Sequence, residues 1–429
     1  MVVDMVQPRL KGFKVTAKVE AALEKFFDNV TITRLNYELV QIERAPGRVL
    51  AEDLVSQVNV PSYNRSAMDG YAVVAVDTFG SSQTSPTLLG LANQVDIGKY
   101  PTFQLRKGEA AEITTGAILP AGADAVVMLE YVRKTDMKQI EVQTSVIPGE
   151  NVSKAGEDVR PGDLVLKQGT RLKPPDVAML AELSMDKVRV VRKPIVAIIC
   201  SGNELVELGT PPSPGEILNT NRFLLLAMIE QLGASSNYLG IAKDSVEDIC
   251  RLIRKGLAEA DIVLVTGGTS VGGKDLVPDA VNVVGKPGMV VHGISIRPGM
   301  PTGLAAVNGK PIVLLSGQPV AAMIGFDVFV RLLVLRLLGT EDEPVATVRG
   351  RMSRRVASAA GMRTYLRVIV KEIDGAYVAD PVTTTGSGIL SSMTQANGIV
   401  VIPEDKEGIE MNEEVTVILF RPVGRTRRD

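Results

Sequence analysis

A glycine-rich stretch that follows a short apolar run contains the residues best suited to chemistry. Positions 260–277 read ADIVLVTGGTSVGGKDLV. Glycines let a backbone turn sharply and approach a ligand closely, and the amide groups of such a turn can point at an anion. A helix that begins directly after the turn adds the positive end of its dipole. The pattern predicts a loop that binds phosphate or another oxyanion, formed by Gly267, Gly268, Thr269, Ser270 and Gly272.

Two other interpretations of this stretch remain open on the residues alone. Many glycine-rich turns after strands only connect one element to the next. Residues 268–274 also match the G-x-x-x-x-G-K pattern of a P-loop, but the next residue is Asp275 instead of the Ser or Thr that a P-loop offers to Mg²⁺. We therefore favour an oxyanion or nucleotide loop with its own carboxylate over a P-loop.

Charged residues stand at the ends of other apolar runs. Glu204 and Asp244 each follow such a run, and Arg297 precedes a Pro-Gly pair. Arginine offers a rigid, bidentate cation to an oxyanion. His292 is the only histidine, so any metal would be a hard cation held by Asp and Glu oxygens. On the residues alone, Asp244 could simply precede a helix cap, Asp275 could be a cap itself, and Arg297 could form a surface ion pair.

An alternation of strands and helices between 194 and 340 would bring these residues together. The expected strands are 195–200, 237–242, 262–265 and 311–315. The expected helices are 220–232, 246–257, 276–284 and a long one that ends at 338. Repeated βα units of this size predict an α/β domain with a doubly wound parallel sheet and right-handed crossovers. Ligands bind such sheets beyond the carboxyl ends of the strands, which is where each polar cluster lies.

The rest of the chain is expected to be largely β-structure. A mixed α/β base is predicted from 1–57 and 157–193, beginning with an amphipathic helix over 15–27. An elongated β-rich arm is expected over 58–156, where short strand patterns alternate with Gly/Pro turns. The segment 341–429 is predicted to form a C-terminal β-barrel. The expected fold class is thus multidomain α/β plus β.

The composition argues against several classes of function. The formal net charge is −2, and 4% of the residues are aromatic with no tryptophan, so we expect no nucleic-acid partner. No apolar run approaches the ~20 residues that span a bilayer, and the first residues lack a secretory apolar region, so we expect no membrane partner. The two cysteines, Cys200 and Cys250, give no disulfide framework and fit a reducing, cytoplasmic location.

Six sequence patterns, taken in order along the chain, resemble those of the molybdopterin molybdotransferase family, to which the E domain of gephyrin is similar. They span most of the chain: SAMDGYA at 66–72, TTGA at 114–117 with PAGADAVV at 120–127, GTRL at 169–172, SGNEL at 201–205, GGTSVG at 267–272 with Asp275, and RPG at 297–299. Any one of them could arise by chance, but six in the family's order make a strong match.

The resemblance implies a reaction and roles for several residues. Members of the family insert molybdate (or tungstate) into the dithiolene of adenylyl-molybdopterin, with Mg²⁺-dependent release of AMP. By this resemblance Asp244 and Asp275 are Mg²⁺ ligands, and Glu204 is a further ligand or a base that orients water. Arg297 is the cation that faces an oxyanion.

The resemblance also extends the site beyond the carboxylates. Asn219 and Asn221 are expected to contact a nucleotide base or ribose, and Ser316 is expected to line the same site. Asp69 and Thr115 are implied as catalytic residues through a homodimer, in which the β-rich arm of one subunit reaches the cleft of the other. Weaker candidates lie in the C-terminal domain: Arg363, Ser387 and Ser391.

Two positions depart from the family's pattern, and two other functions stay open. Met300 stands where many relatives carry a second basic residue, and 316–319 read SGQP where PGNP is usual. The alternatives are the molybdopterin adenylyltransferase of the preceding step and a non-enzymatic pterin-binding scaffold. The β-rich domains on both sides of the α/β part favour metal insertion over adenylylation.

Overall fold

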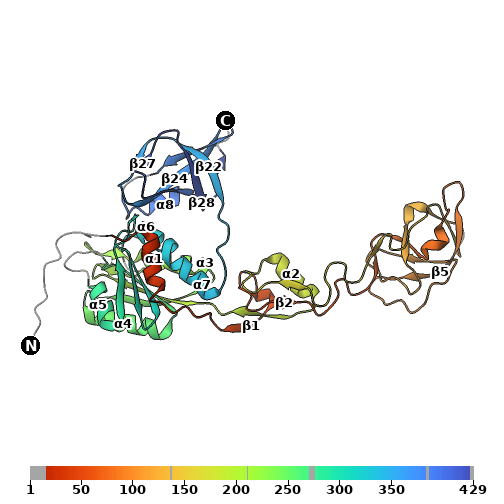
Figure 1. Cartoon of the computed structure of the whole chain (residues 1–429), viewed down its shortest axis with the longest axis horizontal. Helices are drawn as coiled ribbons and strands as arrows, with labels where there is room; N and C mark the ends of the chain where they lie inside the picture. The colour runs from red at the N-terminus through yellow and green to blue at the C-terminus, as the bar shows by residue number, and fades with distance from the viewer. Residues whose placement is uncertain (1–15, 136–137, 210, 270–275, 383–385, 426–429) are drawn as a thin grey trace, which may run out of the picture. The chain divides into compact units, whose positions relative to one another are not determined.

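The chain folds into two compact units. The computed structural model describes residues 16–135, 138–209, 211–269, 276–382 and 386–425. The main unit comprises residues 1–38 and 191–429, and the inserted unit comprises residues 39–190 (Figure 1). The predicted four-part division at 57/58, 156/157, 193/194 and 340/341 stays a prediction. In the described ranges, no helix combines the length and the apolarity needed to cross a membrane.

A six-stranded sheet forms the centre of the α/β part of the main unit. Its strand order is β16-β13-β17-β21-β20-β18. The strands span Ile195–Ser201 (β13), Ser235–Ala242 (β16), Ile262–Thr266 (β17), Pro287–His292 (β18), Gly303–Val307 (β20) and Lys310–Leu315 (β21). The first four strands in the order are parallel, which confirms the predicted parallel sheet.

Two strands at one side of this sheet were absent from the sequence prediction. β20 runs antiparallel to both β21 and β18, so the sheet as a whole is mixed. β20 and β21 form a hairpin whose turn is Asn308-Gly309, with φ of 51° and 78°. An Asn-Gly pair between apolar runs is a strong hairpin signal because both turn residues need positive φ. The signal was present in the sequence and was missed.

Helices cover the sheet on both faces, as a doubly wound fold requires (Figure 1). They are Val19–Phe27 (α1), Thr220–Gln231 (α3), Val246–Glu259 (α4), Val277–Val284 (α5), Pro319–Gly325 (α6) and Arg331–Leu338 (α7), with a π-helical turn at Phe326–Val330 between the last two. The predicted helix starts at 220 and 246 are confirmed: Asn219 caps α3 by accepting from the amide of Arg222, and Ser245 caps α4 by accepting from that of Asp248. The first helix begins at Val19, four residues after its predicted start.

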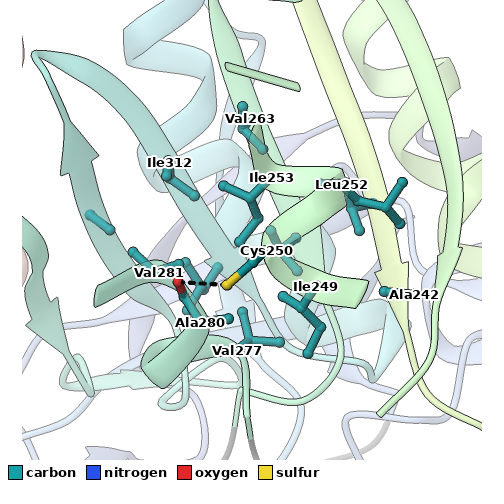
Figure 2. Packing of buried hydrophobic residues seen from close by; sticks show 14 of the residues in the cluster. Ala242, Ile249, Cys250, Leu252, Ile253, Val263, Val277, Ala280, Val281 and Ile312 are labelled. Atoms are coloured by element: carbon teal, nitrogen blue, oxygen red, sulfur yellow. Dashed lines mark hydrogen bonds between the residues drawn. The ribbon is translucent and has the colours of Figure 1, made fainter. Parts of the chain in front are cut away.

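The core between the sheet and helices α4 and α5 is apolar throughout. Figure 2 shows Ile249, Cys250 and Ile253 of α4 packed against Val277 and other residues of α5. Ala197 of β13 and Val263 of β17 contribute to this cluster from the sheet. The alternate residues of both strands, which point to the other face of the sheet, are also buried. Strands buried on both faces need continuous apolar runs, which explains the sequence of β13 and β17.

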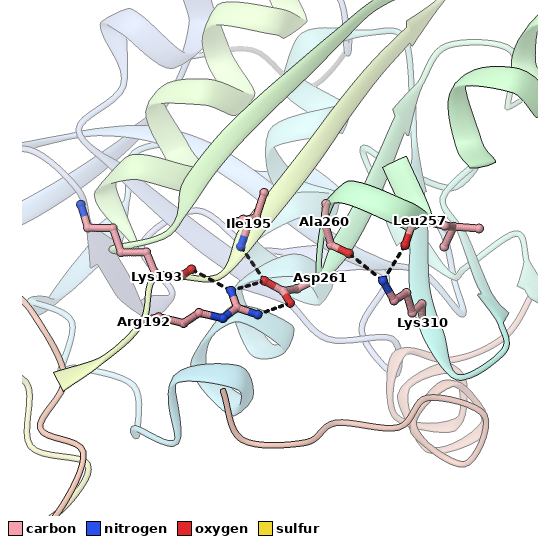
Figure 3. A network of polar contacts seen from close by, with 7 residues as sticks. All are labelled: Arg192, Lys193, Ile195, Leu257, Ala260, Asp261 and Lys310. Atoms are coloured by element: carbon pink, nitrogen blue, oxygen red, sulfur yellow. Dashed lines mark hydrogen bonds and ion pairs between the residues drawn. The ribbon is translucent and has the colours of Figure 1, made fainter. Parts of the chain in front are cut away.

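A polar network ties the start of β13 to the start of β17 at the amino ends of these strands (Figure 3). The Arg192 guanidinium donates two hydrogen bonds to the Asp261 carboxylate, at 2.7 and 2.8 Å, and the amide of Ile195 donates a third at 2.8 Å. Burial raises the pKa of Asp261, but these bonds outweigh it and hold the pKa below its ordinary value. Lys310 donates to the carbonyl of Ala260 beside it, at 3.3 Å.

Replacing Asp261 with Asn should lower the free energy of unfolding by about 1–3 kcal/mol, because it leaves Arg192 and the Ile195 amide with a weaker acceptor. The folded-state pKa lies below the unfolded value of about 3.9, so this contribution is present above that pH and is lost as pH falls through the folded pKa. Urea unfolding at pH 7 and pH 3 measures it. The difference between the D261N and wild-type curves should be smaller at the lower pH, and equal curves at pH 7 would contradict the assignment.

The C-terminal part of the main unit is a closed barrel, which confirms the sequence prediction. Its five strands are Thr347–Met352 (β22), Arg363–Ile373 (β24), Ala376–Pro381 (β25), Gly398–Ile402 (β26) and Glu414–Leu419 (β28). β24 pairs with both β25 and β26, which closes the ring. Smaller elements complete this part: Val356–Ala357 (β23), Ser391–Gln395 (α8), Gly408–Ile409 (β27) and Gly424–Arg425 (β29).

A short strand joins the barrel to the α/β part. Ile296–Arg297 (β19) lies in the α/β part of the chain but pairs in parallel with β24 of the barrel. The amide of Arg363 also donates to the carbonyl of Ser295, at 2.9 Å. Arg297 is therefore held at the seam where the two parts of the main unit meet.

The inserted unit is mainly β-structure, as its sequence predicts. Its sheet has the order β7-β4-β6-β5-β9-β8. The strands are Gly70–Val73 (β4), Thr87–Val95 (β5), Glu109–Ile113 (β6), Ala125–Met128 (β7), Val132–Lys134 (β8) and Gln139–Val142 (β9). Leu54–Val55 (β2) pairs with Leu164–Leu166 (β11), Arg65–Ser66 (β3) with Val152–Ser153 (β10), and Pro174–Glu182 forms helix α2. Tyr37–Gln41 (β1) and Lys187–Val191 (β12) pair where the chain passes between the units.

Candidate active site

A cavity of about 1000 Å³ lies at the carboxyl ends of β13, β17 and β21. The rim of the α/β part forms one wall, and residues 364–367 of the barrel strand β24 contribute to the other. A cavity of this size can enclose a drug-sized ligand. Ten of the residues predicted from sequence line it: Glu204, Asn219, Asn221, Asp244, Gly267, Gly268, Thr269, Arg297, Ser316 and Ser387.

Other predicted residues are placed elsewhere. Ser270, Gly272 and Asp275 lie outside the described residues, so their roles stay predictions. Arg363 and Ser391 are not among the described residues that line the cavity. The Arg363 guanidinium instead pairs with Glu20 of α1 at 2.7 Å and with Glu404 at 2.9 Å.

Asp69 and Thr115 belong to the inserted unit, where they form a pair of their own. The Asp69 carboxylate accepts from the Thr115 amide at 2.7 Å and from the Thr115 hydroxyl at 2.9 Å. These two bonds hold the pKa of Asp69 below its ordinary value, the amide contributing the larger part. Both side chains are exposed, so the ionised carboxylate is presented to solvent.

The glycine turn after β17 has room for glycine only. Gly267 and Gly268 have φ of +89° and +59°. A Cβ at 267 would lie 2.1 Å from the carbonyl oxygen of Ser201, and one at 268 would lie 2.9 Å from a methyl group of Val277. The backbone of this turn therefore forms part of the cavity wall directly, with no side chain in between.

Carboxylates occupy the rim of the cavity next to the glycine turn. Asp244 and Asn203 join two neighbouring loops: the Asn203 amide donates to the Asp244 carboxylate at 3.3 Å, and the Asp244 amide donates to the Asn203 side chain at 3.1 Å. Glu204 folds back over Gly202, where a Cβ would lie 2.5 Å from Glu204 Oε1. Both carboxylates are exposed. Among the described residues no group of three or more potential metal ligands forms, and Asp275 lies outside them.

Two arginines face the cavity from the seam with the barrel. Arg297 is exposed and forms no ion pair within the part of the chain that the structure describes. Arg367 is only 4% exposed, and burial lowers the pKa of its guanidinium. Arg367 was not among the residues predicted from sequence to form the site. Its neighbours Leu366 and Val368 belong to the barrel core, so alternation places Arg367 on the outer face of β24.

Asn219 is positioned by a partly buried polar network beside the cavity. Its Nδ2 donates to the Tyr238 hydroxyl at 3.0 Å, and that hydroxyl donates to Glu207. Arg222 pairs with Glu207 at 2.8 Å and stacks over the Tyr238 ring at 4.3 Å. Burial and the bond to Glu207 raise the pKa of Tyr238, so this hydroxyl stays protonated.

Cys200 is a core residue and not a nucleophile. It is fully buried, and burial raises the pKa of its thiol to about 12. A thiol with this pKa holds almost no thiolate at neutral pH.

Three family models match successive segments that together make up most of the chain. Residues 17–184 match the MoeA N-terminal region (domains I and II), residues 197–336 match a probable molybdopterin-binding domain, and residues 349–420 match the MoeA C-terminal region (domain IV). The matched segments cover both described units.

Complete relatives and a solved structure agree with this match. A putative molybdopterin biosynthesis protein of Methanocaldococcus jannaschii is 38% identical over 390 residues, covering 89% of this chain and 92% of the relative. The molybdopterin molybdenumtransferase of Bacillus subtilis is 32% identical and covers 90% of each chain. A crystal structure of a MoeA molybdopterin biosynthesis protein from Pyrococcus horikosii has a TM-score of 0.82 at 38% identity, covering 95% of this chain and 100% of that one. The chain therefore belongs to the MoeA family of molybdopterin molybdenumtransferases.

Proposed function

We propose that the protein catalyses the last step of molybdenum-cofactor synthesis. It would insert molybdate, or tungstate, into the dithiolene of adenylyl-molybdopterin and release AMP with the help of Mg²⁺. The observation that carries this proposal is a cavity in which a glycine turn, two carboxylates and two arginines meet. The names of the relatives support the same reaction, since several of them are molybdopterin molybdenumtransferases.

The polar groups of the cavity divide between the anionic parts of this substrate. The glycine turn at Gly267 and Gly268 brings bare backbone to the cavity, which suits a phosphate group. Arg297 and Arg367 provide positive charge on the barrel side, where a tetrahedral oxyanion would be neutralised. Arg367 also supplies the second cation that the family pattern would place at position 300, where this chain has methionine.

The donor set fits a divalent, oxygen-seeking cation. The exposed carboxylates of Glu204 and Asp244 line the cavity, and carboxylate oxygens are the ligands that Mg²⁺ prefers. We propose Asp244, together with Asp275, as its ligands. When bound, Mg²⁺ would neutralise charge on the phosphoanhydride. The Asn203–Asp244 hydrogen bonds fix the loop that carries this carboxylate. We propose Glu204, which lines the same cavity, as a further ligand or as a base that orients the attacking water.

The inserted unit is proposed to act through a second subunit. In a homodimer, Asp69 and Thr115 of one copy would complete the cavity of the other. Their mutual hydrogen bonds keep the Asp69 carboxylate ionised, which suits a charged role at a phosphate or metal site. A cytoplasmic location, with no nucleic-acid or membrane partner, remains part of this proposal.

Incubation of the intact chain with adenylyl-molybdopterin, molybdate and Mg²⁺ tests the function. We expect that AMP is released, which chromatography detects, and that the product activates an apo-molybdoenzyme. Omitting molybdate or chelating Mg²⁺ should each suppress AMP release. ATP-dependent adenylylation of molybdopterin without molybdate-dependent AMP release would instead support the adenylyltransferase alternative.

A further inference from the structure

The side-chain amide of Asn221 has a fixed orientation in the cavity wall. Its Nδ2 donates to the Thr266 hydroxyl at 2.7 Å and to the carbonyl of Gly317 at 2.9 Å. A carbonyl can only accept, so the NH₂ group must face Gly317 and the amide cannot be flipped. The Thr266 hydroxyl in turn donates to the carbonyl of Ser316 at 3.0 Å, so it accepts from Asn221. This bridge links the ends of β17 and β21.

The other end of the amide is left without a partner. Asn221 Oδ1 is buried, in a residue that is 6% exposed, and it accepts no hydrogen bond from any described residue. Asn221 lines the cavity. Buried polar atoms are nearly always hydrogen-bonded, so an orphan acceptor in a cavity wall indicates a position for a donor. Both amide hydrogens are already in use, so only the acceptor is available to a ligand.

A second orphan atom lies in the wall of the same cavity. Ser201 is 3% exposed, and its Oγ has no hydrogen-bond partner among the described residues. Ser201 ends β13, and its hydroxyl lies beside the glycine turn, 3.4 Å from the position that a Cβ on Gly268 would occupy. Unlike Asn221, this hydroxyl can donate or accept.

We propose that Asn221 Oδ1 and Ser201 Oγ form a neutral subsite for N–H or O–H donors on the organic part of the substrate. This inference rests on the proposed function. A deprotonated oxyanion has no hydrogen to offer Asn221 Oδ1 and would be repelled by its partial negative charge. The subsite therefore binds the organic part of the substrate, and the arginines and the glycine turn bind the anionic groups. Suitable donors are the amino and ring N–H groups of a pterin, or the amino and hydroxyl groups of an adenosine.

Ser201→Ala is the decisive variant because the hydroxyl that it removes holds no bond within the described protein. Ser295→Ala is the matched control: Ser295 is also buried, but its hydroxyl bonds Thr16 at 2.7 Å and it does not line the cavity. Asn221→Ala is the second variant, with urea unfolding to measure the loss of its bridge to Gly317. Calorimetric titrations with AMP, with molybdopterin lacking AMP and with molybdate separate the possible donors.

S201A and N221A should weaken binding of one organic ligand about tenfold to a hundredfold and leave molybdate binding unchanged. Weaker binding of AMP would place the donor on the nucleotide, and weaker binding of molybdopterin would place it on the pterin. Wild-type affinity of S201A for both organic ligands, or a loss of molybdate affinity alone, would overturn the subsite while the proposed function stands. A wild-type protein that bound neither organic ligand would instead reject the proposed function.

Discussion

Replacing Gly267 with alanine should abolish turnover and lower the free energy of unfolding by several kcal/mol. The new Cβ would meet the Ser201 carbonyl at 2.1 Å, and φ of +89° is itself unfavourable for alanine by about 1–2 kcal/mol. The turn can relieve the clash only by moving away from β13, which displaces the cavity wall. A displacement of about 1 Å at a site that orients reacting groups can cost a hundredfold in rate.

Gly375→Ala separates the clash from the backbone strain. Gly375 also has positive φ, +79°, but no atom lies within 4 Å of a Cβ built there, and it is not among the residues that line the cavity. This variant should lose only about 1 kcal/mol and keep its AMP-release rate. If G267A and G375A proved equally stable and equally active, the close packing of the turn on β13 would be irrelevant to the site.

Replacing Arg297 with alanine should reduce kcat/KM for molybdate-dependent AMP release by about 100- to 1000-fold, the usual effect of removing one preorganised charge-stabilising group. The fold should be unaffected, because Arg297 is exposed and has no ion-pair partner in the described ranges. Arg297→Lys should recover only part of the loss, since an ammonium cannot form the paired hydrogen bonds of a guanidinium. Initial rates over a molybdate series measure this.

Arg349→Ala is the control for Arg297. Arg349 is a barrel arginine whose side chain is 83% exposed, and its ion pair with Glu414 is long, at 3.6 Å. Because exposed ion pairs contribute little, removing Arg349 should change neither stability nor kinetics measurably. If the R297A enzyme kept the wild-type dependence of its rate on molybdate concentration, Arg297 would not bind the oxyanion. Arg367 would then be the remaining candidate cation.

Local signals in the sequence predicted much of the main unit. The apolar run at β17 and the helical patterns that begin at 220 and 246 predicted a strand and two helix starts, because each pattern depends on neighbouring residues only. The rule that ligands bind beyond the carboxyl ends of parallel strands then brought Glu204 and Asp244 to one rim. The residue roles within that rim remain predictions.

What the sequence could not show depends on contacts between distant segments. Arg367 lies in a strand of alternating residues, and it is only 4% exposed in the folded protein, where it lines the cavity. Its place in the alternating pattern is the same as that of an arginine that faces solvent, so the sequence does not distinguish the two. The orphan atoms of Ser201 and Asn221 are equally invisible in sequence, because they are defined by which neighbours are missing.

The main unit is built from two stretches of the chain, residues 1–38 and 191–429, so a ribosome synthesises its first helix long before the strands that cover it. Thr16 bonds Ser295, 279 positions later, and Glu20 of α1 pairs with Arg363, 343 positions later. At roughly 5–20 residues per second, a ribosome needs tens of seconds to deliver these partners. The inserted unit is complete long before then, since all its residues lie between 39 and 190. The apolar face of helix α1 therefore stays uncovered until strands β18 and β20, on which it packs, have been synthesised. This makes the nascent chain a candidate client for chaperones.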